Sequence, residues 1–172
     1  MKELIDIYDE NRNRTGLQLP RKGSFLKKGQ FMLYALALLE NKDGLFLITQ
    51  RSRDKKWAAG AWEVPGGGAQ AGEDSLQAVC REVLEETGLD LSETGEKKPV
   101  YSYINEDLKR GDNYFVDIFH FHVDFEPQEV TIDSSEAIDF KLASLEDITA
   151  LEKSEGFLHY KRILEALEAE KA

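Results

Sequence analysis

The sequence predicts an α/β domain, because apolar runs of strand length are interspersed with segments that carry a helical apolar stripe. The strand-like runs are residues 31–40, 45–51, 100–104 and 114–125. Apolar residues recur at three- and four-residue intervals in residues 76–83 and again in residues 155–169, as in amphipathic helices. The 172 residues suit one domain with a sizeable core, spanning residues 1–172.

The first elements are predicted to be a β-hairpin and a linker, together residues 1–28. Ile5 and Ile7 alternate with more polar neighbours, and another extended piece begins at Thr15. A basic, polar linker follows over residues 20–29. The next two strands flank Asn-Lys-Asp-Gly, which predicts a second hairpin because Gly44 suits the turn position that needs a positive φ.

The later elements are two more strands and two helices. The run over residues 114–125 alternates phenylalanines onto one face, and a short strand is predicted around residues 138–140. Ser144 opens a sequence typical of a capping box and therefore of a short helix. The helix over residues 155–169 is expected to bury Phe157, Tyr160, Ile163, Leu164 and Leu167.

The most informative segment runs from Gly67 to Leu89 and reads Gly-x5-Glu-x7-Arg-Glu-Val-x-Glu-Glu-x-Gly-Leu. Glu82, Glu85 and Glu86 lie at i, i+3 and i+4, so a helix stacks three carboxylates on one face. Because like charges at this spacing repel, the pattern predicts a bound cation. Mg²⁺ or Mn²⁺ is expected, since both take oxygen ligands. A solvated acidic helix is the alternative.

The rest of the segment favours the metal site over a solvated face. Residues 62–65 form a short strand that leads into three glycines at 66–68, which predict a loop of unusual backbone freedom. Glu73 and Asp74 suit the first turn of the helix, and Gly88 suits its C′ position. Strand, glycine loop, acidic helix and glycine stop therefore form one unit.

This unit resembles the signature of the Nudix hydrolases and matches it at every fixed position. The resemblance implies a Nudix-type α/β/α sandwich around a mixed β-sheet. It also implies hydrolysis of a diphosphate linkage, usually in a nucleoside diphosphate derivative. Metal would be held mainly by Glu82 and Glu86, with help from Glu85 and a backbone carbonyl near Gly66. The residues that brace the motif would be Gly67, Glu73, Arg81 and Gly88.

The N-terminal region resembles the Nudix branch related to isopentenyl diphosphate isomerase. The matching positions are Glu3, residues 7–11, residues 14–16, residues 50–52 and Trp62. Isomerase chemistry needs a cysteine in the loop after Trp62 and histidine metal ligands, but this loop reads Pro-Gly-Gly-Gly-Ala. Because function lies in the site, a hydrolase is expected. An isomerase relative and a non-catalytic nucleotide-sensing module are the alternatives.

A hydrolase of this kind also needs a carboxylate that takes a proton from the attacking water. In the family this base often comes from a loop a few residues before an aromatic residue, and Glu136 has that relation to Phe140. Glu85 is the second candidate and Glu129 the third. The alternative for Glu136 is an ordinary solvent-exposed loop glutamate.

Arg51, Arg53, Lys55 and Lys56 form a basic cluster in an acidic chain. Such a cluster near the glycines would receive substrate phosphates, and a solvated loop is the alternative. Trp57, Tyr101 and Tyr103 are candidates for stacking on a nucleobase, although aromatic residues on strands mostly belong to the core.

Two histidines, His120 and His122, are expected to point the same way along one strand. Such a pair can bind a metal ion, but the sequence shows no third ligand beside it. An isolated pair is more often part of the surface or the core.

The composition of the chain limits the classes of molecule that the protein is expected to bind. The net charge of −11 weighs against binding a nucleic acid polymer or an anionic membrane. A small phosphorylated substrate is compatible with this charge, because bound metal inverts the local field. The single cysteine, Cys80, falls on the apolar helix stripe, and no apolar segment is long enough to cross a bilayer. A cytoplasmic protein is expected, and a homodimer is possible.

Overall fold

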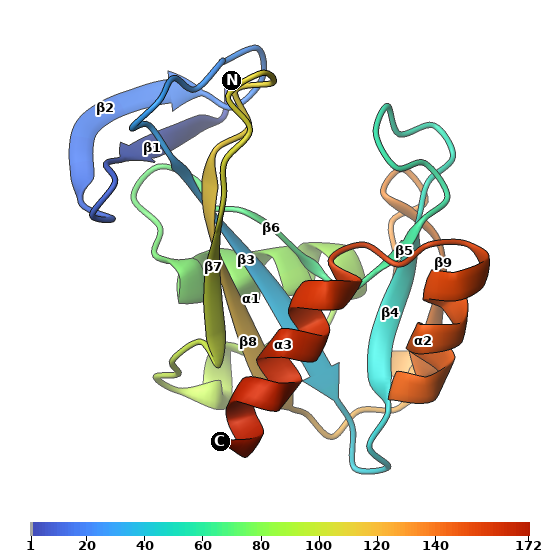
Figure 1. Cartoon of the computed structure of the whole chain (residues 1–172). Coiled ribbons are helices and arrows are strands. Elements are labelled where there is room, and N and C mark those ends of the chain that lie inside the picture. The colour runs from blue at the N-terminus through green and yellow to red at the C-terminus, as the bar shows by residue number, and fades with distance from the viewer. Residues whose placement is uncertain (1) are drawn as a thin grey trace.

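The computed structural model describes residues 2–172 and centres on a mixed β-sheet between helices (Figure 1). The strands of this sheet are β3 (Met32–Glu40), β4 (Phe46–Arg51), β5 (Trp62–Glu63), β6 (Gly66–Gly68), β7 (Tyr101–Asn105), β8 (Tyr114–His122) and β9 (Ala137–Ala143). They lie in the order β5-β4-β3-β8-β7, with β6 paired to β3 and β9 paired to β4. The β3–β8 pair is parallel and the other pairs are antiparallel.

Helices cover both faces of the sheet, which confirms the predicted sandwich. They are α1 (Ser75–Thr87), α2 (Leu145–Ser154) and α3 (Tyr160–Lys171), with short 3₁₀ turns η1 (Ser92–Thr94) and η2 (Pro127–Glu129). Ala35 of β3 packs with Val79 of α1, whereas the next residue, Leu36, packs with Ile148 of α2 and Ile163 of α3. The two-residue period of β3 thus builds one core on each face.

The predicted hairpin between β3 and β4 is present, but its strands separate soon after the turn. Gly44 has the expected positive φ of 74°. The two strands pair only at Glu40 and Phe46. Farther along, β3 pairs with β6, while β4 pairs with β5 and β9. This separation lets the glycine strand β6 enter beside β3.

The predicted helix over residues 155–169 is wrong at its start, because the chain turns between α2 and α3. Gly156 has φ +83° and His159 has φ +61°, and both values lie in the left-handed region that interrupts a helix. Phe157, between them, is 4% exposed and bridges to Trp62 of β5. Its burial therefore comes from a connecting segment and not from a helix face.

The predicted N-terminal hairpin is confirmed as the two strands β1 (Leu4–Tyr8) and β2 (Arg14–Pro20), which form a sheet of their own. It projects beside the main sheet in Figure 1. An isolated β-bridge joins Tyr8, at the end of β1, to Phe31, the residue before β3. The hairpin also contacts the segment before α1, where the Ala71 N–H donates to the carbonyl of Leu4 at 2.8 Å.

An ion pair between the exposed Arg12 and the buried Asp117 fastens this hairpin to the main sheet. Arg12, in the β1–β2 turn, donates from Nη1 to Oδ1 of Asp117 at 2.8 Å, and its other terminal nitrogen pairs with the second oxygen. Asp117 lies on β8, is 1% exposed and also accepts from Ser102 at 2.6 Å. Burial disfavours the charged carboxylate, but the hydrogen bonds from Arg12 and from Ser102 outweigh it, so the pKa of Asp117 is lowered.

Replacing Arg12 by Met should destabilise the protein by about 3 kcal/mol, because it leaves the buried Asp117 carboxylate without its countercharge. Urea unfolding measures this change. Lys42→Met removes the exposed partner of Glu126 and should change the stability little. In the double variant Arg12→Met/Asp117→Asn part of the loss should be recovered. Strict additivity of the two substitutions would show that the pair is not coupled.

Candidate active site

Helix α1 carries the acidic motif and is fixed at both ends by local hydrogen bonds. Asp74 is the N-cap: its side chain accepts from the Gln77 N–H at 2.8 Å, and the Gln77 side chain accepts from the Asp74 N–H at 2.9 Å. The prediction that Glu73 and Asp74 occupy the first turn is therefore wrong, because both precede the helix. At the other end Gly88 has φ +75°, as predicted for a glycine stop.

The three glycines before α1 form the strand β6 and not the predicted loop of unusual backbone freedom. Their role is to let the helix and the neighbouring strand approach closely. A Cβ on Gly67 would lie 2.3 Å from the carboxylate carbon of Glu82. A Cβ on Gly66 would lie 2.3 Å from the carbonyl oxygen of Ala35 on β3. A side chain on Gly66 would thus strike the backbone of β3, whereas one on Gly67 could be accommodated only if the Glu82 side chain moved.

This close approach places two glutamates of α1 against the sheet. Glu86 accepts a hydrogen bond from the Gly66 N–H at 3.1 Å, and the Glu82 side chain is 12% exposed. Burial raises the pKa of both carboxyl groups, and for Glu86 the charges of Glu82 and Glu63 raise it further. Crowded, partly buried carboxylates of this kind fit a hard divalent cation, which would supply the missing positive charge.

Arg81 and Glu73 connect the segment before α1 to the middle of the helix. The Arg81 guanidinium donates to both oxygens of Glu73, at 2.7 and 3.0 Å, and to the carbonyl of Gly68 at 3.1 Å. Glu73 also accepts from the Gln70 N–H at 2.8 Å. These contacts hold β6 and the following turn against the helix. Arg81 further lies 3.1 Å from Glu82, which offsets part of the negative charge there.

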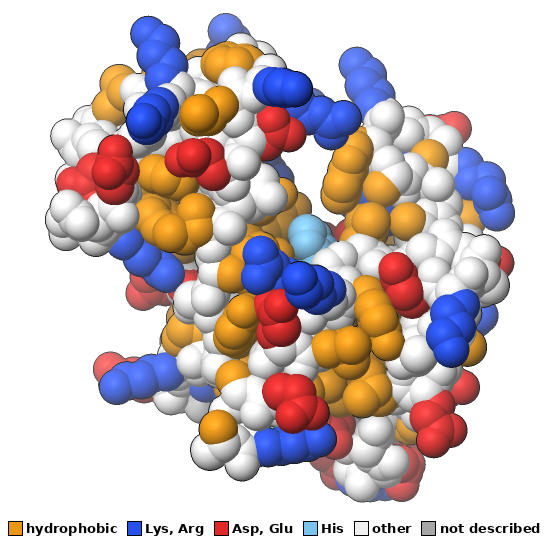
Figure 2. All heavy atoms as spheres, in the orientation of Figure 1, with side chains coloured by type: hydrophobic (Ala, Val, Ile, Leu, Met, Phe, Trp, Pro, Cys, Tyr) orange, Lys and Arg blue, Asp and Glu red, His pale blue; other side chains and the backbone are white. Residues whose placement is uncertain are grey.

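The carboxylates open into a cavity of about 720 Å³. Its lining residues are Glu3, Arg21, Lys22, Tyr34, Thr49, Arg51, Lys55, Glu63, Gly66, Gly67, Gln70, Arg81, Glu82, Glu85, Glu86, Asp133, Glu136 and Ala137. One wall comes from the N-terminal segment and the other from the β4–β5 and β9 region. The space-filling view shows the molecule hollowed between these two parts at its upper edge (Figure 2).

The structure divides the predicted basic cluster. Arg51 and Lys55 line the cavity, whereas Arg53 and Lys56 are exposed and lie outside its lining. Arg51 is held by Glu63, with Nη1 and Oε1 3.3 Å apart. The prediction that all four basic residues face the substrate is therefore not supported by the lining of this cavity.

The three candidates for the general base lie in different surroundings. Glu136, just before β9, lines the cavity and pairs with the Lys55 ammonium at 2.5 Å. Glu85 also lines it and is 57% exposed, 3.3 Å from Arg81. Glu129 lies in η2, outside the lining, and caps the backbone N–H of Glu126.

Glu63 and Arg21 are two of the cavity residues that the sequence alone did not predict. Glu63 of β5 is half-buried, and burial raises the pKa of its carboxyl group against the opposing effect of Arg51. The sequence does hint at this residue, because Glu63 alternates with the apolar Trp62 on the strand that leads into the motif. Arg21 reaches the cavity from the N-terminal linker and donates to Glu3 at 3.0 Å. Only the folded path of the linker brings it there.

The predicted base-stacking tyrosines lie elsewhere. Tyr101 and Tyr103 of β7 pack toward α3, where the Tyr101 hydroxyl donates to Glu165 at 2.6 Å and the Tyr103 hydroxyl lies 3.2 Å from Nδ1 of His159. Neither residue lines the cavity. Trp57, in contrast, is 54% exposed near the cavity, with the Arg51 guanidinium 5.4 Å from its ring centre.

Comparison with known sequences decides the family. The sequence model of the NUDIX domain matches residues 31–167. The chain belongs to the Nudix hydrolases. An uncharacterized Nudix hydrolase of Listeria monocytogenes is 32% identical over 158 residues, which is 90% of this chain and 88% of that protein. An RNA pyrophosphohydrolase of Erythrobacter litoralis is 39% identical over 64 residues, which is 36% of this chain and 38% of that protein. The Nudix chain is thus an enzyme of the pyrophosphohydrolase class.

Solved structures agree with the Nudix fold. The Nudix domain of NrtR from Shewanella oneidensis, complexed with ADP ribose, superposes with a TM-score of 0.62 at 18% identity. The match covers 83% of this chain and 89% of that one. At this identity the likeness shows the fold alone.

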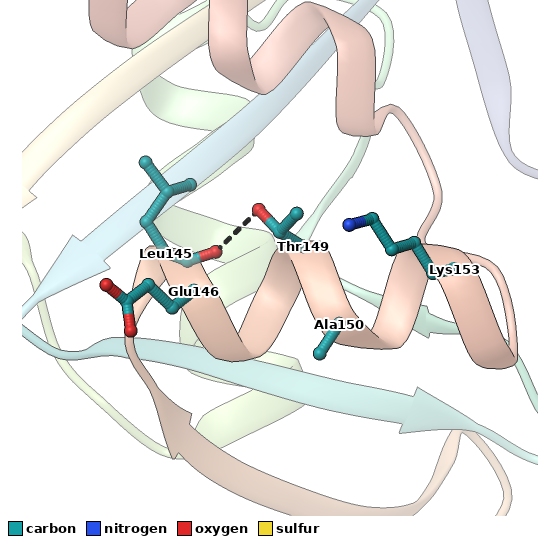
Figure 3. A pocket seen from close by; sticks show the side chains of 5 residues that line it. All are labelled: Leu145, Glu146, Thr149, Ala150 and Lys153. Carbon is teal, nitrogen blue, oxygen red and sulfur yellow. Dashed lines mark hydrogen bonds between the residues drawn. The ribbon is translucent and has the colours of Figure 1, made fainter.

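A second cavity of this Nudix hydrolase, of about 550 Å³, lies along α2 (Figure 3). Leu145, Glu146, Thr149, Ala150 and Lys153 line it. The Thr149 hydroxyl donates to the carbonyl of Leu145 at 2.9 Å and lies 2.9 Å from the Tyr160 hydroxyl of α3, so both neighbours engage it. Within residues 2–172, no helix is long and apolar enough to cross a membrane.

Two of the three glycines of β6, Gly66 and Gly67, should respond differently to alanine. Gly67→Ala meets the mobile end of the Glu82 side chain, so the protein should fold while this carboxylate is displaced and turnover falls by about a hundredfold. Gly66→Ala meets the backbone of β3 and should lower the melting temperature strongly. Thermal unfolding and initial rates test both. Full activity of Gly67→Ala would remove the argument for close approach.

Proposed function

We propose that this enzyme hydrolyses a diphosphate linkage in a nucleoside diphosphate derivative, with Mg²⁺ or Mn²⁺ held by Glu82 and Glu86. The observation that carries the proposal is this pair of carboxylates in the cavity, whose charges are unfavourable without a cation. Glu85 and the backbone carbonyl of Gly66 would complete the ligand set. The ion would neutralise charge on the phosphates and activate a water molecule.

The basic residues of the cavity would bind the diphosphate. Arg51 keeps free N–H groups beyond those that face Glu63, because a guanidinium has five donors. The Lys55 ammonium has three donors and can contact a phosphate oxygen while it remains beside Glu136. Arg21 adds a third cation from the opposite wall. These local charges explain how a chain with a net charge of −11 can bind an anionic substrate.

We assign proton removal to Glu136. Its side chain is 52% exposed and lines the same cavity as Glu82 and Glu86, so water can reach it. In the reaction the water oxygen forms a bond to one phosphorus as the bond from that phosphorus to the bridging oxygen breaks. Glu136 takes the water proton, and the bridging oxygen leaves on the second phosphorylated product.

A phosphate-release screen tests the proposal across nucleoside diphosphate sugars, dinucleoside polyphosphates, nucleoside triphosphates and prenyl diphosphates. Turnover should require Mg²⁺ or Mn²⁺ and stop with chelator. Glu86→Gln should lower it by on the order of a hundredfold, because it removes charge from the proposed metal shell at constant volume. Full activity in chelator, or an unaffected Glu86→Gln variant, contradicts the metal site. Conversion of isopentenyl diphosphate into dimethylallyl diphosphate would instead favour the isomerase alternative.

The assignment of the base can be tested with three matched substitutions. Glu136→Gln should reduce kcat more than it raises KM and should remove the acidic limb of the pH–rate profile, because proton transfer occurs in the transition state. Glu129→Gln, outside the cavity, should leave the rate unchanged. If Glu85→Gln removes the limb and Glu136→Gln does not, the base is Glu85.

A further inference from the structure

A second group of metal-ligating side chains lies at the end of β3 and β8, outside the active-site cavity. It consists of Glu40, His120 and His122, each with one ligand atom within 4.8 Å of the others. The distance from Glu40 Oε2 to His120 Nε2 is 2.5 Å, and the distance from the same oxygen to His122 Nδ1 is 3.8 Å. The imidazole rings are 4.4 Å apart. Glu40 is the third ligand that the sequence alone did not reveal.

The strand register explains why these residues meet. His120 and His122 are two residues apart on β8, so their side chains leave the same face. In the parallel β3–β8 pair, Glu40 lies opposite His122 and Leu38 lies opposite His120. Adjacent strands are about 4.8 Å apart, which brings Glu40 beside both imidazoles. The rigid sheet, and not a flexible loop, fixes their spacing.

A fourth side chain orients the buried imidazole. Glu170, in the last turn of α3, lies 2.5 Å from Nδ1 of His120, the nitrogen that does not face Glu40. A carboxylate that accepts the N–H of one ring nitrogen leaves the lone pair of the other nitrogen directed at a metal. The His120 side chain is 7% exposed while that of His122 is 68% exposed, so the group is anchored on one side and open on the other.

We propose that Glu40, His120 and His122 bind a transition-metal dication such as Zn²⁺, with Glu170 as the carboxylate that positions His120. Two imidazoles and one carboxylate are a ligand set typical of zinc, and imidazole nitrogens are poor ligands for Mg²⁺. A tetrahedral ion with these three ligands keeps one position for water or another donor. The alternative is a protonated His120 that bridges Glu40 and Glu170 and needs no metal.

The proposed zinc site is separate from the acidic motif. Gly66 of β6 pairs with Leu36, four residues before Glu40 on β3. At the rise of an extended strand, Leu36 and Glu40 are about 13 Å apart. None of Glu40, His120, His122 and Glu170 lines the active-site cavity. Binding at one site can therefore be measured independently of binding at the other.

Isothermal titration of the full chain with Zn²⁺, in a constant excess of Mg²⁺, tests the proposal. One Zn²⁺ should bind, and binding should persist in Glu86→Gln, which disables the proposed catalytic metal site. His122→Ala should abolish it without unfolding, because this side chain is exposed. Glu170→Gln should weaken binding by about 10- to 100-fold, since it removes only the orienting carboxylate. Glu168→Gln, an exposed residue of the same helix paired with Lys171, is the matched control and should bind normally.

The imidazole NMR signals locate the ion, because the chain has three histidines. Those of His120 and His122 should shift with Zn²⁺, while that of His159, which faces Tyr103, should not. Equal zinc binding by the native protein and His122→Ala overturns the proposal. So does the absence of any binding that survives Glu86→Gln, whatever the outcome of the hydrolase assays.

Discussion

The architecture of the active site depends on the close approach of α1 to the glycine strand β6. A side chain on Gly67 would occupy the space of the Glu82 carboxylate, and one on Gly66 would strike the backbone of β3. Because both positions lack a Cβ, two glutamates can lie against the sheet, where burial makes their charges costly. The same contact therefore creates both the position of the ligands and the unfavourable charge that a cation would relieve.

The rest of the fold supports this contact from two sides. Arg81 joins the middle of α1 to Glu73 and Gly68, so the helix cannot move away from β6 without breaking several hydrogen bonds. The N-terminal hairpin contacts the turn before α1 and is itself held by the ion pair between Arg12 and the buried Asp117. The hairpin precedes residues 31–167, which match the family, yet it carries Arg21 to the cavity wall. A segment outside the family match thus contributes to the site.

How much of this was predictable depends on the range of the interactions involved. The acidic motif, its glycine stop and the N-terminal hairpin follow from local spacing, and the structure has each of them. The role of the glycines was misjudged, since close approach to Glu82 is a tertiary contact that φ preferences do not express. The start of the last helix was also missed, because Phe157 is apolar for its contact with Trp62 and not for a helical stripe. Likewise Glu40 joins the two histidines only through the parallel register of β3 and β8, which no local pattern encodes.

Strand β3 connects the two proposed metal sites, whose ligand chemistry differs. Near Leu36 it pairs with β6, beside a set of carboxylate oxygens that suits a hard ion; at Glu40 it contributes one oxygen beside two imidazole nitrogens. Nitrogen ligands favour zinc and its neighbours, whereas sites with only oxygen ligands suit magnesium and manganese. Zn²⁺ and Mg²⁺ carry the same charge, so the type of ligand atom would decide which of the two ions each proposed site binds. The sheet fixes Glu40, His120 and His122, and the packing of α1 on β6 fixes Glu82 and Glu86. Occupation of either proposed site would therefore require little rearrangement of the backbone.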